Sequence, residues 1–134
     1  MKIGFIGCGN MATAMLKGIL KSGEVAATDM IASAKSDKTR KKIEQELGIQ
    51  KADTNAQVVD FADVVFLAVK PLFLEGVLDE IKDSVKEGQI FISIAPGKTL
   101  QWLGEHLGMH TKVIRTMPNT PAMVGEGMTA LCVN

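Results

Sequence analysis

The stretch VVFLAV, residues 64–69, is apolar at all six positions and is followed directly by Lys70 and Pro71. A strand with one face in water alternates apolar and polar residues, whereas a strand that is apolar throughout must be covered on both faces. Strands of that kind occur in parallel sheets that carry helices on either side. The run is far shorter than the ~20 residues of a membrane span. It therefore predicts an internal strand of a parallel sheet.

Shorter apolar segments alternate with amphipathic segments along the rest of the chain. The predicted strands are Ile3–Ile6, 30–34, 64–69, 89–95, 112–117 and 128–133, and the predicted helices cover 12–23, 36–48, 72–85 and 99–108, with a short helix before Val64. Strands that alternate with helices of about 10–15 residues are typical of a doubly wound sheet. We predict one Rossmann-like α/β domain over residues 1–134, with three layers and a mostly parallel sheet.

Composition narrows the possible partners and the compartment. The 15 basic and 15 acidic side chains cancel, so no overall field attracts nucleic acid or anionic lipid. The N-terminus has no signal-peptide core, and two cysteines, Cys8 and Cys132, do not make a disulfide framework. We expect a cytoplasmic protein with no nucleic-acid or membrane partner.

A glycine motif, GCGNMA, connects the first predicted strand to the first predicted helix. In a G-x-G-x-x-A motif, Gly7 permits a tight turn, Gly9 lets a diphosphate approach the backbone, and Ala12 lets the helix pack closely on the strand. The helix N-terminus then offers unpaired N–H groups and partial positive charge. The placement favours a dinucleotide over a plain turn. Cys8 can be interpreted as a reactive thiol or as a small side chain in a crowded turn, and we favour the second.

The end of the second strand indicates which dinucleotide is bound. Asp29 lies about 20 residues after the glycines, where an NAD enzyme carries its ribose-binding acid. However, MIASA makes the better strand, so Asp29 precedes that strand and Lys35 and Ser36 follow it. A lysine and a hydroxyl favour the 2′-phosphate of NADP(H), while Asp37 leaves NAD(H) open.

Basic and histidine residues elsewhere have less specific interpretations. Lys41 and Lys42 are interpreted as a solvated helix face. Lys70, held extended by Pro71, either directs its loop toward the ligand crevice or marks the exit of a strand into water. His106 and His110 lie four apart without a carboxylate or cysteine to complete a metal site, so we predict none.

Four segments together resemble pyrroline-5-carboxylate reductase. They are GFIGCGNMA (4–12), FLAVKP (66–71), SIAPG (93–97) and, most distinctive, VIRTMPNTPAMVGEGMTAL (113–131). The resemblance extends over essentially the whole chain. It implies an oxidoreductase of proline biosynthesis that transfers hydride from NADPH to the C=N carbon of 1-pyrroline-5-carboxylate and gives L-proline.

The resemblance also implies positions for the ligands. The expected cofactor contacts are Ile6, Gly7, Cys8, Gly9, Asn10, Met11, Ala34, Lys35, Ser36, Asn55, Ala68, Val69, Lys70, Pro71, Ala95, Pro96 and Gly97, and the substrate-side loop is Met117, Pro118, Asn119 and Thr120. Without the resemblance, Asn55 would be interpreted as a helix cap. Pro96 departs from the family, in which a small residue is more usual.

Members of this family continue into a helical C-terminal domain that forms the dimer and supplies most substrate contacts. This chain ends at Asn134, so we expect the cofactor-binding domain alone, inactive in isolation. The full-length form is expected to be a homo-oligomer, and the oligomeric state of this domain by itself stays open. No catalytic residue is assigned. Two alternatives stay open: a non-catalytic NADP-binding module, or another NADP-dependent oxidoreductase of the β-hydroxyacid or prephenate dehydrogenase type. The chain lacks the substrate lysine, serine or histidine signatures that the second alternative requires.

Overall fold

β1 (Ile3–Ile6) and β4 (Val64–Leu67) pair in parallel near the middle of a seven-stranded sheet, whose order is β3-β2-β1-β4-β5-β6-β7. The computed structural model describes all residues from 1 to 134. Six strands are parallel, and β7 pairs antiparallel with β6. The structure confirms the predicted Rossmann-like α/β fold with a mostly parallel sheet. None of its helices is long and apolar enough to cross a bilayer.

The other elements follow in chain order. They are α1 (Asn10–Ser22), η1 (Ala27–Asp29), β2 (Met30–Ser33), α2 (Asp37–Gln45), β3 (Gln50–Ala52), α3 (Asn55–Phe61), α4 (Pro71–Ile81), η2 (Lys82–Ser84), β5 (Ile90–Ser93), α5 (Leu100–Leu107), β6 (Lys112–Pro118), η3 (Thr120–Val124) and β7 (Thr129–Val133).

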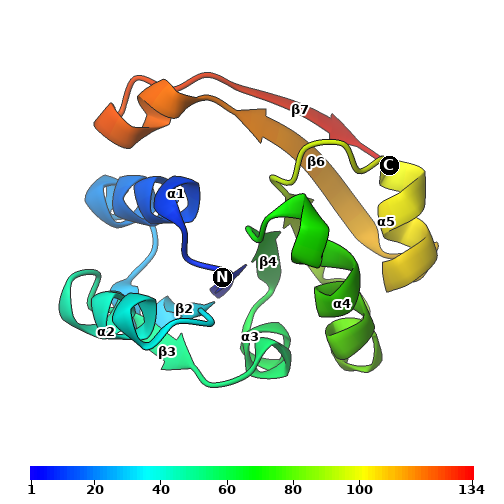
Figure 1. The fold of residues 1–134 in the computed structure, drawn as a ribbon, viewed down its shortest axis with the longest axis horizontal. Coiled ribbons are helices and arrows are strands. Elements are labelled where there is room, and N and C mark those ends of the chain that lie inside the picture. The colour runs from blue at the N-terminus through cyan, green and yellow to red at the C-terminus, as the bar shows by residue number, and fades with distance from the viewer.

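Helices cover both faces of the sheet and make three layers (Figure 1). One apolar cluster joins the sheet to α1 and α2 and includes Phe5 and Leu16. The second joins the opposite face to α3, α4 and α5 and includes Leu67 and Leu78. In β4, Phe66 belongs to the first cluster and Leu67 to the second. This strand is buried on both faces, as its continuous apolar sequence predicts.

Several predicted element ends differ from the structure by a few residues, and two of these differences lie on either side of Lys70. β4 ends at Leu67 rather than at residue 69. Pro71 does not end the strand but is the first residue of α4, where its missing N–H is no loss. The sequence analysis also missed β3, a three-residue edge strand of which only Ala52 is buried.

The β6–β7 hairpin extends beyond the layered part, and its tip lies against α1 through η3 (Figure 1). The Asn119 side chain closes the tip, because its Oδ1 accepts a hydrogen bond from the backbone N–H of Met128 at 2.9 Å. A Cβ at Gly127 would lie only 2.7 Å from Ala122. These contacts brace the tip of the hairpin, and the prolines and glycines in its sequence restrict the backbone further. Every residue of β7 is exposed.

Packing of α3 on β1 gives a test of the core. A Cβ on Gly4 would lie 2.5 Å from Cγ1 of Val58 and 2.9 Å from Cβ of Ala62. We expect Gly4→Ala to lower the free energy of unfolding by about 1–3 kcal/mol through overpacking, as measured by urea denaturation. Gly18→Ala, in α1 with nothing within 4 Å of its Cβ position, is the control. It should raise stability by roughly 0.5–1 kcal/mol. Equal effects of the two substitutions would contradict the packing described here.

Candidate functional site

Four strand-to-helix joints that contain most of the expected cofactor contacts lie at one edge of the sheet. They follow β1, β2, β4 and β5, which are parallel neighbours. Adjacent strands are about 4.8 Å apart, so the joints form one continuous row. In open α/β sheets, ligands bind in the crevice at this edge. The structure thus brings residues 7–11, 34–36, 68–71 and 95–97 to the same edge.

Gly7 makes the turn out of β1 in a conformation and a space that only glycine fits. Its φ is +93°, and its N–H donates to the carbonyl oxygen of Ser33 at 3.1 Å. A Cβ there would lie 2.7 Å from the carbonyl oxygen of Ala68. The first glycine of the motif therefore fixes the direction in which the chain enters α1.

Gly9 has a different reason to be glycine. Its φ of −76° and ψ of −167° are accessible to any residue, and nothing lies within 4 Å of its Cβ position. A side chain here would project into open space rather than into the protein. This is the cradle that a dinucleotide diphosphate needs beside bare backbone.

The N-terminus of α1 has no side-chain cap and no acidic residue in its first turn. By contrast, α2, α3 and α5 are capped by the side chains of Ser36, Thr54 and Thr99. Unpaired first-turn N–H groups, together with the helix dipole, make an anion site. The N-terminus of α4 also lacks a side-chain cap, but Pro71 has no N–H and the N–H of Phe73 donates to the carbonyl oxygen of Lys70, so α4 offers fewer unpaired donors.

The Cys8 side chain is buried in the turn. Its Sγ lies 3.8 Å from Oγ1 of Thr13. Burial raises the pKa of the Cys8 thiol, although the Thr13 hydrogen bond and the charge of Lys42 act in the opposite direction. A protonated, buried thiol is a poor nucleophile. The structure supports the interpretation of Cys8 as a small side chain in a crowded turn.

A basic cleft of about 540 Å³ runs from the glycine turn along α2. Gly9 and Asn10 line one end, and Lys38, Lys41 and Lys42 line the α2 wall. The interpretation of Lys41 and Lys42 as a merely solvated helix face was therefore incomplete. The i, i+3, i+4 spacing of the three lysines is the sequence signal that places them on one face of α2. Their charge suits an anion held at Gly9.

The end of β2 has the order of residues predicted from the sequence. Asp29 lies in η1, before the strand. Lys35 is exposed, and the Ser36 hydroxyl accepts a hydrogen bond from the N–H of Thr39 at 3.2 Å. The hydroxyl thus caps α2 and fixes the turn.

Arg40 and Asp37 support this turn from α2. Arg40 Nε donates to the carbonyl oxygen of Ala34 at 2.7 Å, and its Nη1 lies 4.0 Å from Oδ1 of Asp37. The Asp37 side chain is 92% exposed, and a separation of 4.0 Å is too long for a hydrogen bond. Asp37 therefore stays accessible to a ribose hydroxyl.

Asn55 is not a helix cap. Thr54 caps α3, and Gln57 completes a capping box. The Asn55 amide instead accepts a hydrogen bond from Ser33 Oγ at 2.6 Å and donates one to Glu80 Oε2 at 2.8 Å. It thus connects the end of β2 to α4, beside the predicted cofactor crevice.

Of the two remaining joints, the one after β4 has the extended backbone predicted for it. Lys70 is extended, with φ −60° and ψ 145°, and its side chain is exposed. Ala95 is buried, whereas Pro96 and Gly97 are exposed and Gly97 has a φ of +77°. Both joints therefore present backbone at the crevice edge.

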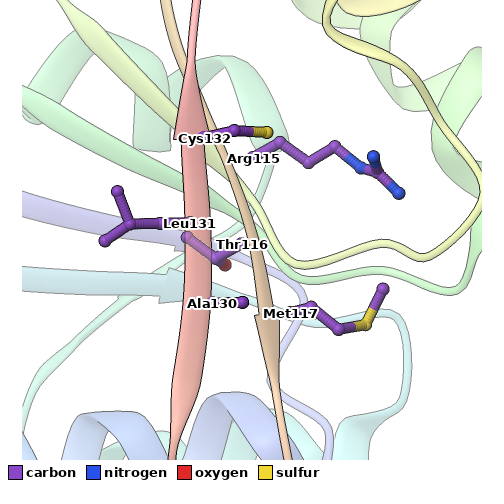
Figure 2. A pocket seen from close by; sticks show the side chains of 6 residues that line it. All are labelled: Arg115, Thr116, Met117, Ala130, Leu131 and Cys132. Carbon is purple, nitrogen blue, oxygen red and sulfur yellow. The ribbon is translucent and has the colours of Figure 1, made fainter.

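Figure 2 shows a pocket of about 220 Å³ on the β6–β7 hairpin. Arg115, Met117 and Cys132 project from one face of the hairpin and Leu131 from the other (Figure 2). The Arg115 Nε is buried without a hydrogen-bond partner. The sequence analysis gave Arg115 no role, although its i+2 spacing from Val113 puts it on a core-facing side of β6.

Both ring nitrogens of His106 contact neighbouring residues, one on α5 and one on α4. Its Nδ1 lies 2.8 Å from the carbonyl oxygen of Trp102, and its Nε2 lies 3.9 Å from Oε1 of Glu75. The Lys98 ammonium lies 4.1 Å from the centroid of the Trp102 ring. No three His, Cys, Asp or Glu side chains are close enough to hold a metal.

Burial of Cys8 predicts unequal thiol reactivity. Iodoacetamide should modify the exposed Cys132 at least about tenfold faster than Cys8 in the native protein, because Cys8 is inaccessible and its pKa is raised. Mass spectrometry of tryptic peptides measures both rates, and Cys132→Ser isolates the slow one. In urea the two rates should converge. Equally fast native modification of both thiols would refute the burial of Cys8.

Comparisons with known proteins agree with the resemblance expected from the sequence. The chain is 42% identical over 133 residues to a pyrroline-5-carboxylate reductase of Escherichia coli. The aligned residues make up 99% of this chain and 49% of that protein. A solved structure of a pyrroline-5-carboxylate reductase from Coxiella burnetii superposes with a TM-score of 0.95 at 34% identity, over 99% of this chain and 49% of that one. The Plasmodium falciparum pyrroline carboxylate reductase, solved with NADP bound, gives 0.85 at 29% identity, over 100% of this chain and 48% of that one.

These matches show what the chain is similar to and how much of each relative it spans. The chain spans about half the length of the curated relatives it matches. The similarity to pyrroline-5-carboxylate reductases predicted from the sequence is confirmed. Residues 2–97, well over half of the chain, match a family of nucleotide-dependent oxidoreductases, and the chain belongs to that family, described as NADP oxidoreductase coenzyme F420-dependent.

Proposed function

We propose that this chain is the NADP(H)-binding domain of a pyrroline-5-carboxylate reductase. In the complete enzyme, it would present NADPH for hydride transfer to the C=N carbon of 1-pyrroline-5-carboxylate, giving L-proline. The observation that carries the proposal is the uncapped N-terminus of α1, which lies behind the Gly7 turn and beside open space at Gly9. Similarity to pyrroline-5-carboxylate reductases over almost the whole chain supplies the reaction.

The residues at the sheet edge fit NADP(H) from its diphosphate to its adenosine end. The first-turn amides of α1 and the lysines of α2 suit the diphosphate. Lys35 and Ser36 suit a 2′-phosphate, because both are exposed at the end of β2. The Plasmodium falciparum relative, described with NADP bound, supports the same choice.

The contribution of this chain to the reaction is placement. Nicotinamide supplies the hydride, and the protein holds the reacting partners in line and excludes water. We propose that residues 95–97 and the loop at Met117 to Thr120 lie at the nicotinamide end. A protonated imine accepts hydride more readily, so a donor is needed near the ring nitrogen. We propose that this donor, and most substrate contacts, belong to the remainder of the complete enzyme.

The β6–β7 hairpin carries exposed apolar side chains, which suggests that another part of the complete enzyme packs on it. They are Met117, Met123, Val124, Met128, Leu131 and Val133. Exposed apolar side chains gathered on one hairpin, here on both of its faces, are typical of an interface. Because the relatives are about twice as long as this chain, we propose that their additional half covers the hairpin and that the complete enzyme is a homo-oligomer.

The two cysteines bear on the cellular compartment in which the protein acts. Cys132 is an exposed free thiol and Cys8 is also unpaired. Free thiols persist in a reducing compartment. We propose that the protein acts in the cytoplasm.

The proposal is tested by measuring binding and turnover on the same sample. Calorimetry with NADPH should show saturable binding, whereas NADPH oxidation in the presence of 1-pyrroline-5-carboxylate should be at background. The reason is that the nucleotide site is complete and the substrate side is not. Turnover by the isolated chain would refute the division between the two halves. Failure to bind NADPH or NADH would refute the cofactor assignment.

Gly9→Val tests the diphosphate cradle. The substitution should weaken NADPH binding by at least about 100-fold, because two charge-assisted hydrogen bonds at roughly 1.5–3 kcal/mol each would be blocked. The unfolding temperature should barely change, since valine adopts the Gly9 backbone angles and meets no protein atom. Gly18→Val, in α1 with open space around its Cβ position, is the matched control and should bind normally. Unchanged affinity of Gly9→Val would contradict the proposal.

A further inference from the structure

A lysine from one strand-to-helix joint lies over an aromatic ring from another. The Lys35 ammonium is 4.3 Å from the centroid of the Phe73 ring. Lys35 follows β2, Phe73 lies in the first turn of α4 after β4, and β1 is the strand between them. The pair therefore spans the sheet edge across the end of β1, the strand that the glycine turn follows.

Phe73 is at this position without belonging to the core. It is 45% exposed, although the next residue, Leu74, is completely buried. Its other neighbour, Leu72, is 84% exposed. Besides the contact with Lys35, an exposed aromatic ring at the rim of a nucleotide crevice offers a flat apolar surface on which a base can stack.

Lys35 is free to leave the ring. None of the four ion pairs in the structure includes Lys35. Cation–π contacts are weak at exposed sites, whereas a lysine-to-phosphate hydrogen bond is charge-assisted and stronger. A phosphate at the end of β2 would therefore compete successfully with the ring for the ammonium group.

We propose that Phe73 is the base-stacking residue of the nucleotide site, and that Lys35 leaves the Phe73 ring for the 2′-phosphate when NADP(H) binds. This inference rests on the proposed function. The adenosine ribose of a bound dinucleotide lies at the end of the second strand, which is where Lys35 and Ser36 are. Adenine is attached to that ribose, so a ring that already contacts Lys35 is within reach of the base.

The two residues then have separable roles. Phe73 contacts adenine, which NADPH and NADH share. Lys35 contacts the 2′-phosphate, which only NADPH carries. Phe73 therefore sets affinity for both dinucleotides, and Lys35 sets the preference between them.

Calorimetry on the full chain separates these roles. Phe73→Leu should weaken NADPH and NADH binding by a similar factor, about tenfold or more. Reduced nicotinamide mononucleotide, which lacks adenine, should bind the variant and the wild type equally. Lys35→Gln should weaken NADPH binding only. Leu72→Ala, an exposed neighbour in the same helical turn, is the control and should change nothing.

Nuclear magnetic resonance observes the movement of Lys35 directly. In the free protein, the Lys35 Cε protons should be shifted upfield by the Phe73 ring current, and the shift should be absent in Phe73→Leu. Saturation with NADP⁺ should remove it from the wild type.

Each negative result has a distinct meaning. Unchanged dinucleotide affinity in a folded Phe73→Leu variant, or a ring-current shift that persists with NADP⁺ bound, would overturn this inference and leave the proposed function intact. A wild-type chain that binds neither dinucleotide would overturn both.

Discussion

The turn at Gly7 has no room for a side chain, and the position of α1 depends on that constraint. The carbonyl oxygen of Ala68 and the hydrogen bond to Ser33 hold the turn between the ends of β4 and β2. A residue with a Cβ would have to displace backbone from a neighbouring strand. The tight exit from β1 therefore determines where the N-terminus of α1 lies, and η3 in turn packs on α1.

The helix N-termini are of two kinds: those capped by a side chain of the protein, and those without such a cap, of which that of α1 faces the proposed ligand. Ser36, Thr54 and Thr99 satisfy the first turns of their helices within the chain. The first turn of α1 has no such cap, and the lysines of α2 line the neighbouring cleft. Because the chain has no net charge, attraction for an anionic ligand comes from this local arrangement and not from an overall field.

The larger features of the fold could be predicted from the sequence because burial and backbone geometry leave clear patterns. VVFLAV indicated a strand buried on both faces, and the larger apolar side chains of MIASA correctly placed Asp29 before β2. The sequence QKA gave no such signal, since β3 forms by pairing with β2 rather than by burial. The signal for Thr54 as the cap was present in TNAQ, a capping-box pattern that the sequence analysis did not use.

Side-chain relationships across the sheet edge could not be predicted in the same way. The contact between Lys35 and Phe73, and the unpartnered Nε of Arg115, depend on strand order and register. The family resemblance indicated which joints meet a cofactor, and the comparisons confirm the resemblance. The ligand contacts of individual residues stay predictions.

A structure of this chain crystallised with NADP⁺ tests the central claim most directly. The account predicts diphosphate oxygens within hydrogen-bond distance of the first-turn amides of α1, with the nucleotide extended along the carboxyl ends of β2, β1, β4 and β5. Density for the nucleotide away from this edge, or a diphosphate bound without contact to α1, would contradict it.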